Sequence, residues 1–380
     1  MKNKMIIKGV IIMLLFCSSL IMCNSNVNAK GVATKITRIK EIKQNIDGEE
    51  VYIRCSFDNC VSNKNGKFSK EPCSAGSDLR NIYAKTKSGK WKTLKELKFR
   101  NIQGGCINGD KMIIAFIDKN RHKKGDLTAF VEIDLVENKV IKVTMVEGAK
   151  DLNIKAFGHS NDFTYLNGSY YGSWYQKNGK KNYTSRIGKI NTKLSGKGII
   201  GDFSKKNKGK AAFGITSYVK ENQLALGIRE NVKSEGKFRL KRYVSLCDVK
   251  INKKGKAQYD LNKKMFYLKK NSKYSTPQCM ERLNKNFYIV RFNKTEGKDN
   301  NCIEVINDKG KKERQYIIKN PQKVTIVQKN GKKIKIKLKK EKWEIESLSH
   351  YKTNVFYYTM YRPSKEKIGK QAYLYKVKLK

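Results

Sequence analysis

The sequence predicts an all-β protein with the architecture of a β-propeller, a ring of four-stranded sheets. Two observations support this prediction. A hairpin motif recurs along the chain about 50–70 residues apart. Short strands with alternating apolar residues follow its copies, and no Pro/Ser/Thr-rich linker interrupts the pattern. A four-stranded unit cannot bury both faces alone, and stacking such units around an axis solves that problem.

The recurring motif is a pair of apolar runs separated by Asp-Gly or Asn-Gly. Its clearest copies are Ile46–Ile53, Ile107–Ile114 and Leu166–Tyr171. Both residue pairs tolerate a positive φ, so they close tight β-hairpins. Looser copies of the motif begin at Val219, Leu283 and His350.

A second hairpin follows the first one, so the repeating unit has four strands. The segment Ala129–Asp134, for example, alternates in polarity and precedes a turn at Asn138 and the strand Val140–Val143. Six such units favour six blades. The expected blades cover residues 34–99, 100–150, 154–200, 211–262, 274–342 and 343–380.

The two ends of the chain are expected to meet in the ring. The last unit, Glu344–Leu379, shows only three strands, and we expect a strand near Val32–Ile36 to supply the fourth and close the ring. Five blades are the alternative, with Thr34–Leu97 outside the ring. A β-solenoid would need shorter and stricter coils, and tandem β-sandwiches would need linkers.

Residues 1–29 have the three parts of a secretory signal peptide. Three lysines precede the apolar run Val10–Met22, and Val27-Asn28-Ala29 is a small-x-small cleavage pattern. We therefore predict cleavage after Ala29 and a secreted, cell-surface-associated protein with one propeller domain over residues 30–380. A retained anchor is the alternative, but the apolar run is shorter than the ~20 residues that span a bilayer. A second alternative is a lipoprotein acylated at Cys23, although Met22 stands where a lipobox has a small residue.

The charge indicates the kind of partner. Lys and Arg total 83 against 33 Asp and Glu, which gives a formal charge of +50, while 39% hydrophobic residues still provide a core. Outside a cell such a protein attracts anionic wall polymers, acidic polysaccharides and the surface of an anionic membrane. Nucleic acid is a poorer fit, since most of the cations are Lys and neither an RNA-binding aromatic signature nor a helix-turn-helix pattern occurs.

One lysine-rich run has the pattern of an outer strand. Between Gly331 and Lys340, apolar residues alternate with lysines, so one face of the strand is cationic. Part of this pattern protects a sheet edge from pairing with other sheets. The predicted polyanion-binding residues are Lys332, Lys333, Lys335, Lys337, Lys339 and Lys340.

A polar pocket is predicted in the central channel, where innermost propeller strands point their polar side chains. When the units are aligned on their hairpin turns, the position four residues before the turn is polar in four of the six units. The segment Gly158–Tyr165 is also rich in reactive side chains. The predicted pocket comprises Gln103, His159, Asn161, Asp162, Gln278, Glu281 and Glu346, with Tyr165 and Trp174 as aromatic platforms for a sugar. The alternative is that Gln103, Asn161 and Asp162 satisfy backbone groups where blades meet.

Catalysis has weaker support in the sequence. Asp162 and Glu346 are the candidates for a carboxylate pair, which glycosidases hold about 5–9 Å apart. Carboxylates occupy too few equivalent positions to assign an acid and a base. Sialidase Asp boxes, nucleophile elbows, zinc motifs, P-loops and dinucleotide motifs are absent from the sequence, so no metal or cofactor is expected.

Seven cysteines remain after removal of the signal peptide, so at least one thiol has no partner within the chain. Cys55, Cys60 and Cys73 lie in a loop-rich region that has room for one disulfide. The other four lie among apolar strand residues and are expected to fill the core, namely Cys106, Cys247, Cys279 and Cys302.

Two stretches resemble blade motifs of helveticin J-like secreted propellers, a group to which phage tail receptor-binding propellers are related. These are Gly158–Tyr165 and Glu344–Leu348 together with the following Phe356–Tyr361. The resemblance implies recognition of bacterial cell-envelope glycans, with bacteriocin-like antibacterial activity as an alternative. The signal peptide and the lysine excess depart from that group.

The sequence thus predicts an exported, non-catalytic propeller. It is expected to bind a cell-envelope glycan or another anionic surface polymer through the channel mouth and the lysine-rich surface. The first alternative is a glycoside hydrolase or lyase that uses the channel carboxylates. A further alternative is a structural surface protein held in place by its charge alone.

Overall fold

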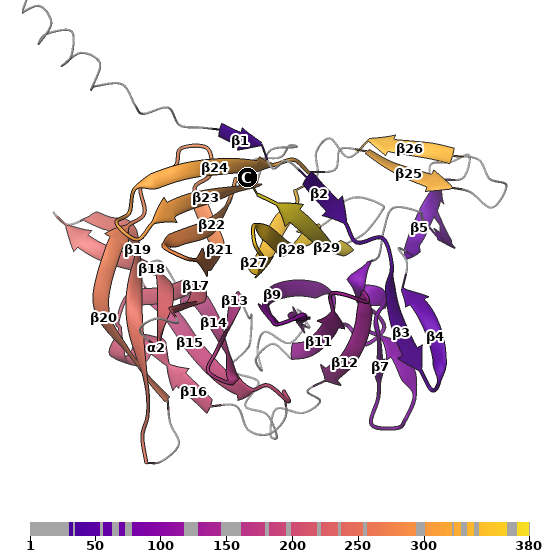
Figure 1. The fold of residues 1–380 in the computed structure, drawn as a ribbon, viewed down its shortest axis with the longest axis horizontal. Helices are drawn as coiled ribbons and strands as arrows, with labels where there is room; N and C mark the ends of the chain where they lie inside the picture. Colours follow the sequence, from indigo (N-terminus) through magenta and orange to yellow (C-terminus); the bar gives the residue numbers. More distant parts are fainter. Residues whose placement is uncertain are drawn as a thin grey trace, which may run out of the picture.

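The computed structural model shows a ring of β-sheets (Figure 1). The residues it describes are 30–32, 35–53, 56–62, 68–72, 78–117, 128–145, 161–178, 182–194, 199–218, 222–234, 237–253, 257–293, 301–320, 323–327, 333–337, 342–362 and 371–379. The predicted signal peptide and its Cys23 lie outside them. No helix among the described residues is long and apolar enough to cross a membrane.

Five inner strands surround the axis of the ring. They are β9 (Asn101–Asn108), β13 (Asp162–Leu166), β17 (Lys210–Tyr218), β21 (Thr276–Leu283) and β27 (Glu344–Lys352). Each contacts the next, and β27 contacts β9, so the circle closes within the described part of the chain. The predicted β-propeller is confirmed, and the blade number is five, the alternative, rather than the favoured six.

Each inner strand begins an antiparallel sheet that runs outward to the rim. The first blade continues through β10 (Lys111–Ile117), β11 (Thr128–Asp134) and β12 (Lys139–Met145), and the second through β14 (Ser169–Asn178), β15 (Asn182–Asn191) and β16 (Ile199–Asp202). The third continues through β18 (Gln223–Ser234), β19 (Lys237–Ile251) and β20 (Ala257–Tyr267), and the fourth through β22 (Asn286–Phe292), β23 (Asn301–Asn307) and β24 (Lys312–Ile318). The fifth continues through β28 (Val355–Arg362) and β29 (Gln371–Lys378).

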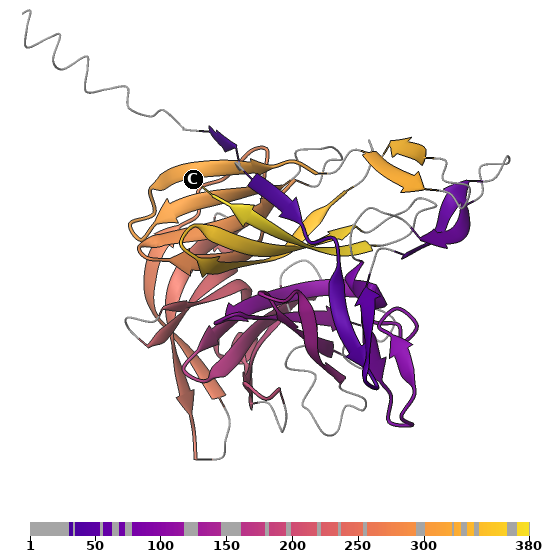
Figure 2. The same cartoon turned by 45° about the vertical axis from the view of Figure 1, so that its right-hand side comes forward.

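The fourth strand of the fifth blade comes from the start of the chain, as predicted. Strand β2 (Lys35–Arg38) pairs antiparallel with β29, with Lys35 opposite Lys378 (Figure 2). Just before it, β1 (Lys30–Val32) pairs parallel with β24 on the outer edge of the fourth blade. The N-terminal segment thus joins the last two blades.

The segment expected to form a sixth blade instead adds strands outside the ring. Strand β3 (Ile42–Ile46) pairs with β4 (Glu49–Ile53) and, in parallel, with the outer edge of β12. The sequence pattern was misleading because a hairpin signal specifies its own turn but not the edge on which the hairpin pairs. The other short elements are β5 (Ser56–Ser62), β6 (Phe68–Pro72), η1 (Leu79–Asn81), β7 (Tyr83–Lys85), β8 (Trp91–Thr93), α2 (Phe203–Lys206), β25 (Lys323–Val327) and β26 (Lys333–Lys337).

The predicted hairpin turns have the expected backbone. Asn167 and Gly168 have φ values of 46° and 71°, and Asp47 and Gly48 have values of 50° and 98°. A positive φ at both central residues matches the right-handed twist of the flanking strands. The looser copies have a positive φ at one described turn residue that is not glycine: Asn222, Asn284 or Thr353.

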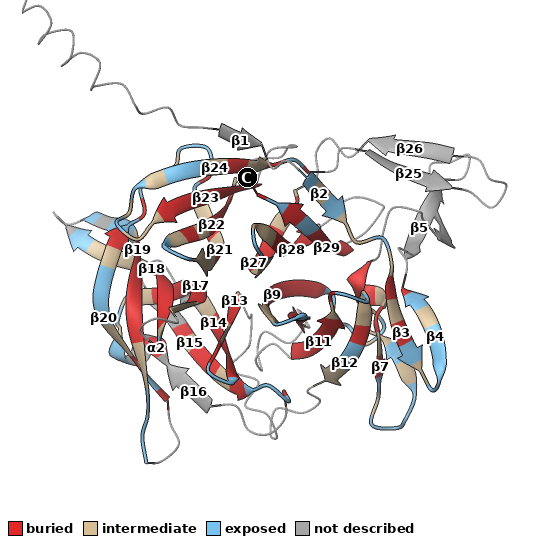
Figure 3. Ribbon diagram, in the orientation of Figure 1, coloured by how far each residue is buried: buried red, intermediate tan, exposed pale blue. Residues whose placement is uncertain are grey.

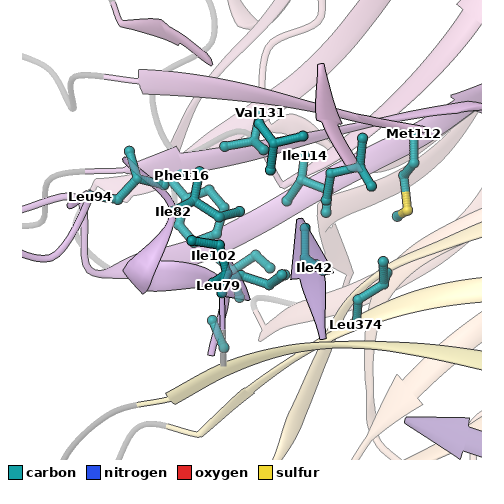
Figure 4. Close-up of a cluster of buried hydrophobic side chains, with 14 of the residues drawn as sticks. Ile42, Leu79, Ile82, Leu94, Ile102, Met112, Ile114, Phe116, Val131 and Leu374 are labelled. Carbon is teal, nitrogen blue, oxygen red and sulfur yellow. The ribbon is translucent and has the colours of Figure 1, made fainter. Parts of the chain in front are cut away.

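Apolar side chains fill the layers between neighbouring blades, and buried positions concentrate on the inner and middle strands (Figure 3). One cluster joins β9, β10 and β11 to Ile42, to Leu79 of η1 and to Leu374 of the fifth blade (Figure 4). The four cysteines expected in the core are free and buried there: Cys106, Cys247, Cys279 and Cys302. The side chains of Cys55, Cys60 and Cys73 lie outside the described part.

Candidate functional site

The polar positions singled out in the sequence lie where inner strands are irregular. Strand β9 shifts register between Ile102 and Gly105, a stretch that contains Gln103. Strands β21 and β27 shift around Gln278 and Glu346, respectively. A β-bulge bends its strand and redirects a side chain, and bulges are frequent near binding sites. Three of the aligned polar residues therefore lie at bulges near the beginning of their strands.

Asp162 occupies the equivalent position at the start of β13 and ties three inner strands together. Its side chain is 0% exposed. Oδ2 accepts hydrogen bonds from the backbone N–H of Ile215 and of Met280, each at 3.0 Å, and Oδ1 accepts one from Phe163 at 3.0 Å. Burial raises the pKa of Asp162 well above its usual range. Both oxygens are committed to backbone groups, so this carboxyl joins blades rather than facing a ligand.

Gly214 leaves room for Asp162 to approach Met280. A Cβ atom at Gly214 would lie 3.3 Å from Asp162 Oδ2 and 3.0 Å from Met280 Cγ. Contacts this short are tighter than ordinary packing, so a side chain at position 214 would displace the carboxyl or the methionine. The alignment of the repeated units did not identify this glycine.

Glu281 makes a second junction between inner strands. Oε1 accepts hydrogen bonds from Thr216 Oγ1 at 3.0 Å and from the backbone N–H of Arg282 at 2.8 Å. Oε2 accepts one from the backbone N–H of His350 at 3.4 Å. Burial raises the pKa of Glu281 to about 7. The side chain thus links β21 to β17 and β27, and it titrates near neutral pH.

The remaining polar groups gather where β9 and β27 begin, between the first and fifth blades. Glu344 and Glu346 lie two residues apart on β27 and are hydrogen-bonded to each other. Burial, followed by the nearby Glu344, raises the pKa of Glu346 well above its usual range. Beside them the Tyr361 hydroxyl donates a hydrogen bond to Asn101 Oδ1 at 2.7 Å. We call these four residues, together with Gln103 and Gln371, the mouth cluster.

The mouth cluster contains unpaired polar atoms. Gln103 donates through Nε2 to the carbonyl oxygen of Ile102 at 2.8 Å, but its Oε1 is buried without a partner among the described residues. Both side-chain polar atoms of Gln371, the first residue of β29, are also buried without a hydrogen-bond partner among the described residues. Buried polar groups normally have a partner, so a water molecule or a ligand hydroxyl is the expected complement.

An ion pair from outside the ring borders this end of the fifth blade. Arg80 of η1 and Asp78, which precedes η1, are both buried and form a two-point ion pair, with Arg80 Nε 2.9 Å from Asp78 Oδ1. Asp78 Oδ1 also accepts a hydrogen bond from the backbone N–H of Ala372 at 3.4 Å. Sequence reasoning missed this pair because it assigned the segment to a blade of its own.

The other predicted pocket residues do not converge on the mouth cluster. Tyr165 packs with Tyr170, ring centroids 5.5 Å apart, in the core between the first two blades. Trp174 is half-buried, with Arg186 over its ring at 5.7 Å. Asn161 Oδ1 accepts a hydrogen bond from the backbone N–H of Tyr175 at 3.3 Å.

Several of the predicted residues are only partly described. His159, Lys332, Lys339 and Lys340 lie outside the described residues. Lys333, Lys335 and Lys337 lie on β26, whose backbone pairs with β25 in the expected hairpin, but their side chains lie outside the described part.

The geometry limits the chemistry of the described carboxyls. Glycosidase carboxyls flank the scissile bond at about 5–9.5 Å. Glu344 and Glu346 are instead in hydrogen-bond contact, and Asp162 is enclosed by backbone donors. Among the described residues, no group of three or more His, Cys, Asp or Glu is placed to hold a metal ion. These described carboxyls therefore do not form a separated pair of the glycosidase kind.

No family model and no curated protein matches this chain. Among solved structures, it is similar to a protein of unknown function from Dyadobacter fermentans, at 10% identity over 74% of this chain and 96% of the other, with a TM-score of 0.39. It is also similar to a GH43_1 enzyme from Xanthomonas citri, at 6% identity over 78% and 90%, with a TM-score of 0.44. A third is an exo-β-1,3-galactanase from Phanerochaete chrysosporium, at 9% identity over 78% and 63%, with a TM-score of 0.45. At these TM-scores the likenesses assign neither an activity nor a ligand to this chain.

Proposed function

We propose that this protein is exported and binds an anionic glycan, or another anionic polymer of the cell envelope, without catalysing a reaction. The observation that carries the proposal is that the acidic and basic side chains lie in different places. On the inner strands, Asp162, Glu281 and Glu346 are bonded to the ring itself or to one another. No lysine whose burial is described is buried, so in this part of the chain the lysine excess leaves a cationic exterior.

Two exposed acidic residues of the outer surface, Asp47 and Asp110, are paired with lysines. Asp110 accepts from Lys352 Nζ at 2.7 Å and from the Tyr351 hydroxyl at 2.5 Å. Asp47 accepts from Lys85 Nζ at 3.0 Å and from Trp91 Nε1 at 2.8 Å. With these carboxylates neutralised, the large surplus of cations sets the sign of the surface potential, which attracts polyanions over long range.

A glycoside hydrolase or lyase would require an accessible acid and base. Asp162 is fully buried, and the two glutamates of the mouth cluster touch each other, so they supply no such pair. A glycan that enters the mouth cluster would meet the unpaired side-chain atoms of Gln103 and Gln371. These groups bind hydroxyls without breaking a glycosidic bond.

A glycan array read at about 0.1 and 1 M NaCl tests the proposal, because at 1 M most surface attraction is screened. We expect acidic glycans to bind at low salt, and any ligand of the mouth cluster to persist at high salt. Gln103→Ala should weaken the persistent class while leaving the salt-sensitive class unchanged. Absence of binding to every acidic glycan at low salt would contradict the proposal.

A further inference from the structure

A groove runs along the outer side of the third and fourth blades. Its first part, about 880 Å³, is lined by Arg239, Lys241 and Arg242 of β19 and by Tyr267 of β20. Its second part, about 760 Å³, is lined by lysines of the fourth blade and of the β20–β21 connection. The two parts share Lys270 and Asn271, so they form one continuous groove.

The groove exists because two strands differ in length. The pairing of β19 with β20 ends at Tyr243 and Tyr267, and the last contact is a 2.9 Å hydrogen bond from the backbone N–H of Leu268 to the carbonyl oxygen of Arg242. Residues 239–241 extend beyond this point without β20 beside them. After Leu268, the chain leaves the sheet toward β21. The exposed edge of β19 therefore forms one wall of the groove.

A glycine contact fixes the opposite wall. Gly310, with φ of 82°, lies in the turn between β23 and β24, and a Cβ atom there would be 2.5 Å from Phe266 Cβ. The turn therefore rests directly on the end of β20. Its neighbours Lys309 and Lys311 are exposed and line the groove.

The charge of the groove is almost entirely positive. Its only lining carboxylate is Glu304, which is buried and paired with Arg291, with Lys312 Nζ at 3.5 Å and with Asn271 Nδ2 at 2.6 Å. Within the described part of the chain, four exposed lining lysines form no ion pair with a carboxylate: Lys269, Lys270, Lys309 and Lys311.

An apolar platform lies beside these cations. Tyr267 is 49% exposed and Leu240 is 42% exposed, although both side chains are large and hydrophobic. The Tyr267 ring is held in place by Lys264, whose Nζ is 2.6 Å from the hydroxyl, and by Lys241 over the ring at 5.9 Å. A pyranose ring offers a face of C–H groups that packs on such an aromatic surface.

We propose that this groove is the binding site for a linear acidic polysaccharide. Its carboxylate or sulfate groups lie beside the lysines, and one sugar ring packs on Tyr267. The inference rests on the proposed function and gives it a location away from the channel. Single-stranded nucleic acid is the less suitable polyanion, because it stacks successive bases on several aromatics. Among the residues that line this groove, Tyr267 is the only aromatic side chain.

Two lysine variants with the same charge change test the location. The first replaces Lys269, Lys270, Lys309 and Lys311 with Gln. The second replaces Lys87, Lys90, Lys92 and Lys208 with Gln; these lysines are exposed and line neither part of the groove. Affinity is measured on immobilised heparin, with neutral dextran as the blank. We expect the groove variant to bind about tenfold or more weaker and the control to change less than about threefold.

The aromatic contact has its own pair of variants. Tyr267→Phe keeps the ring and is expected to retain binding, whereas Tyr267→Ala should weaken it; Tyr52→Ala, at another exposed tyrosine, should not. If wild type binds no acidic polysaccharide, the proposed function fails together with this inference. Equal losses in the two lysine variants would overturn the groove alone. Displacement of bound heparin by single-stranded DNA more readily than by acidic polysaccharide would overturn the ligand class.

Discussion

The carboxylate of Asp162 accepts a hydrogen bond at 3.0 Å from the backbone N–H of Met280, a residue 118 positions further along the chain. The same oxygen accepts from Ile215, so one buried side chain joins inner strands of the second, third and fourth blades. Burial of this carboxyl is therefore compensated by three backbone donors. Its role is to hold the ring together, so this carboxyl group is not available to a ligand.

Substitutions at Asp162 should therefore affect stability in a set order. Asp162→Ala leaves the N–H groups of Ile215 and Met280 buried without acceptors, and each such group costs about 1–3 kcal/mol. Asp162→Asn keeps one oxygen for these two donors and should lose less. Urea denaturation is expected to rank wild type above Asn and Asn above Ala. Equal stability of wild type and the Ala variant would contradict this role.

Glu281 should make stability depend on pH. Its pKa is about 7 in the folded protein against an ordinary value of 4.5, so the folded state retains a proton that the unfolded chain releases. The contribution is fully present below pH 4.5 and is lost as pH rises to about 7, by up to about 3 kcal/mol. Glu281→Gln removes this titration. The difference in unfolding free energy between wild type and variant should therefore change across this range, and a constant difference would refute it.

The sequence determined some features of this fold better than others. Turn chemistry at Asn167-Gly168 is local, so the hairpins and even the closing strand were predictable. The partner of β3 was not, because pairing on the edge of β12 depends on which edge is free. At the site, polarity identified Gln103 and Glu346, but no periodic signal marks Glu344, Tyr361 or Gln371.

The closing strand offers a direct test of the ring. Ile36 on β2 packs against the core of the fifth blade, whereas its neighbour Thr37 is exposed. Ile36→Asp places a charge in that layer and should cost about 2–4 kcal/mol. Thr37→Asp changes the other face of the same strand and should stay within about 0.5 kcal/mol. Similar denaturation midpoints for the two variants would argue against closure by β2.

Gly310 and Gly89 form a matched pair of turn glycines. Both have a positive φ, 82° and 78°, but only Gly310 has a close neighbour, Phe266. Alanine at Gly89 should cost about 1–2 kcal/mol from backbone strain alone. Alanine at Gly310 should cost about 1–3 kcal/mol more, because the methyl group overpacks against Phe266. Thermal unfolding of the two variants measures the difference, and equal losses would contradict the contact.

We propose that this ring holds an acidic glycan without cutting it. The most direct measurement is prolonged incubation of a bound acidic polysaccharide with a stoichiometric amount of protein, followed by mass spectrometry of the polymer. We predict that the polymer is recovered intact, with no new reducing or unsaturated ends, for wild type and for Glu346→Gln alike. New chain ends that appear with wild type and disappear with Glu346→Gln would show that the mouth cluster is catalytic and would contradict the account.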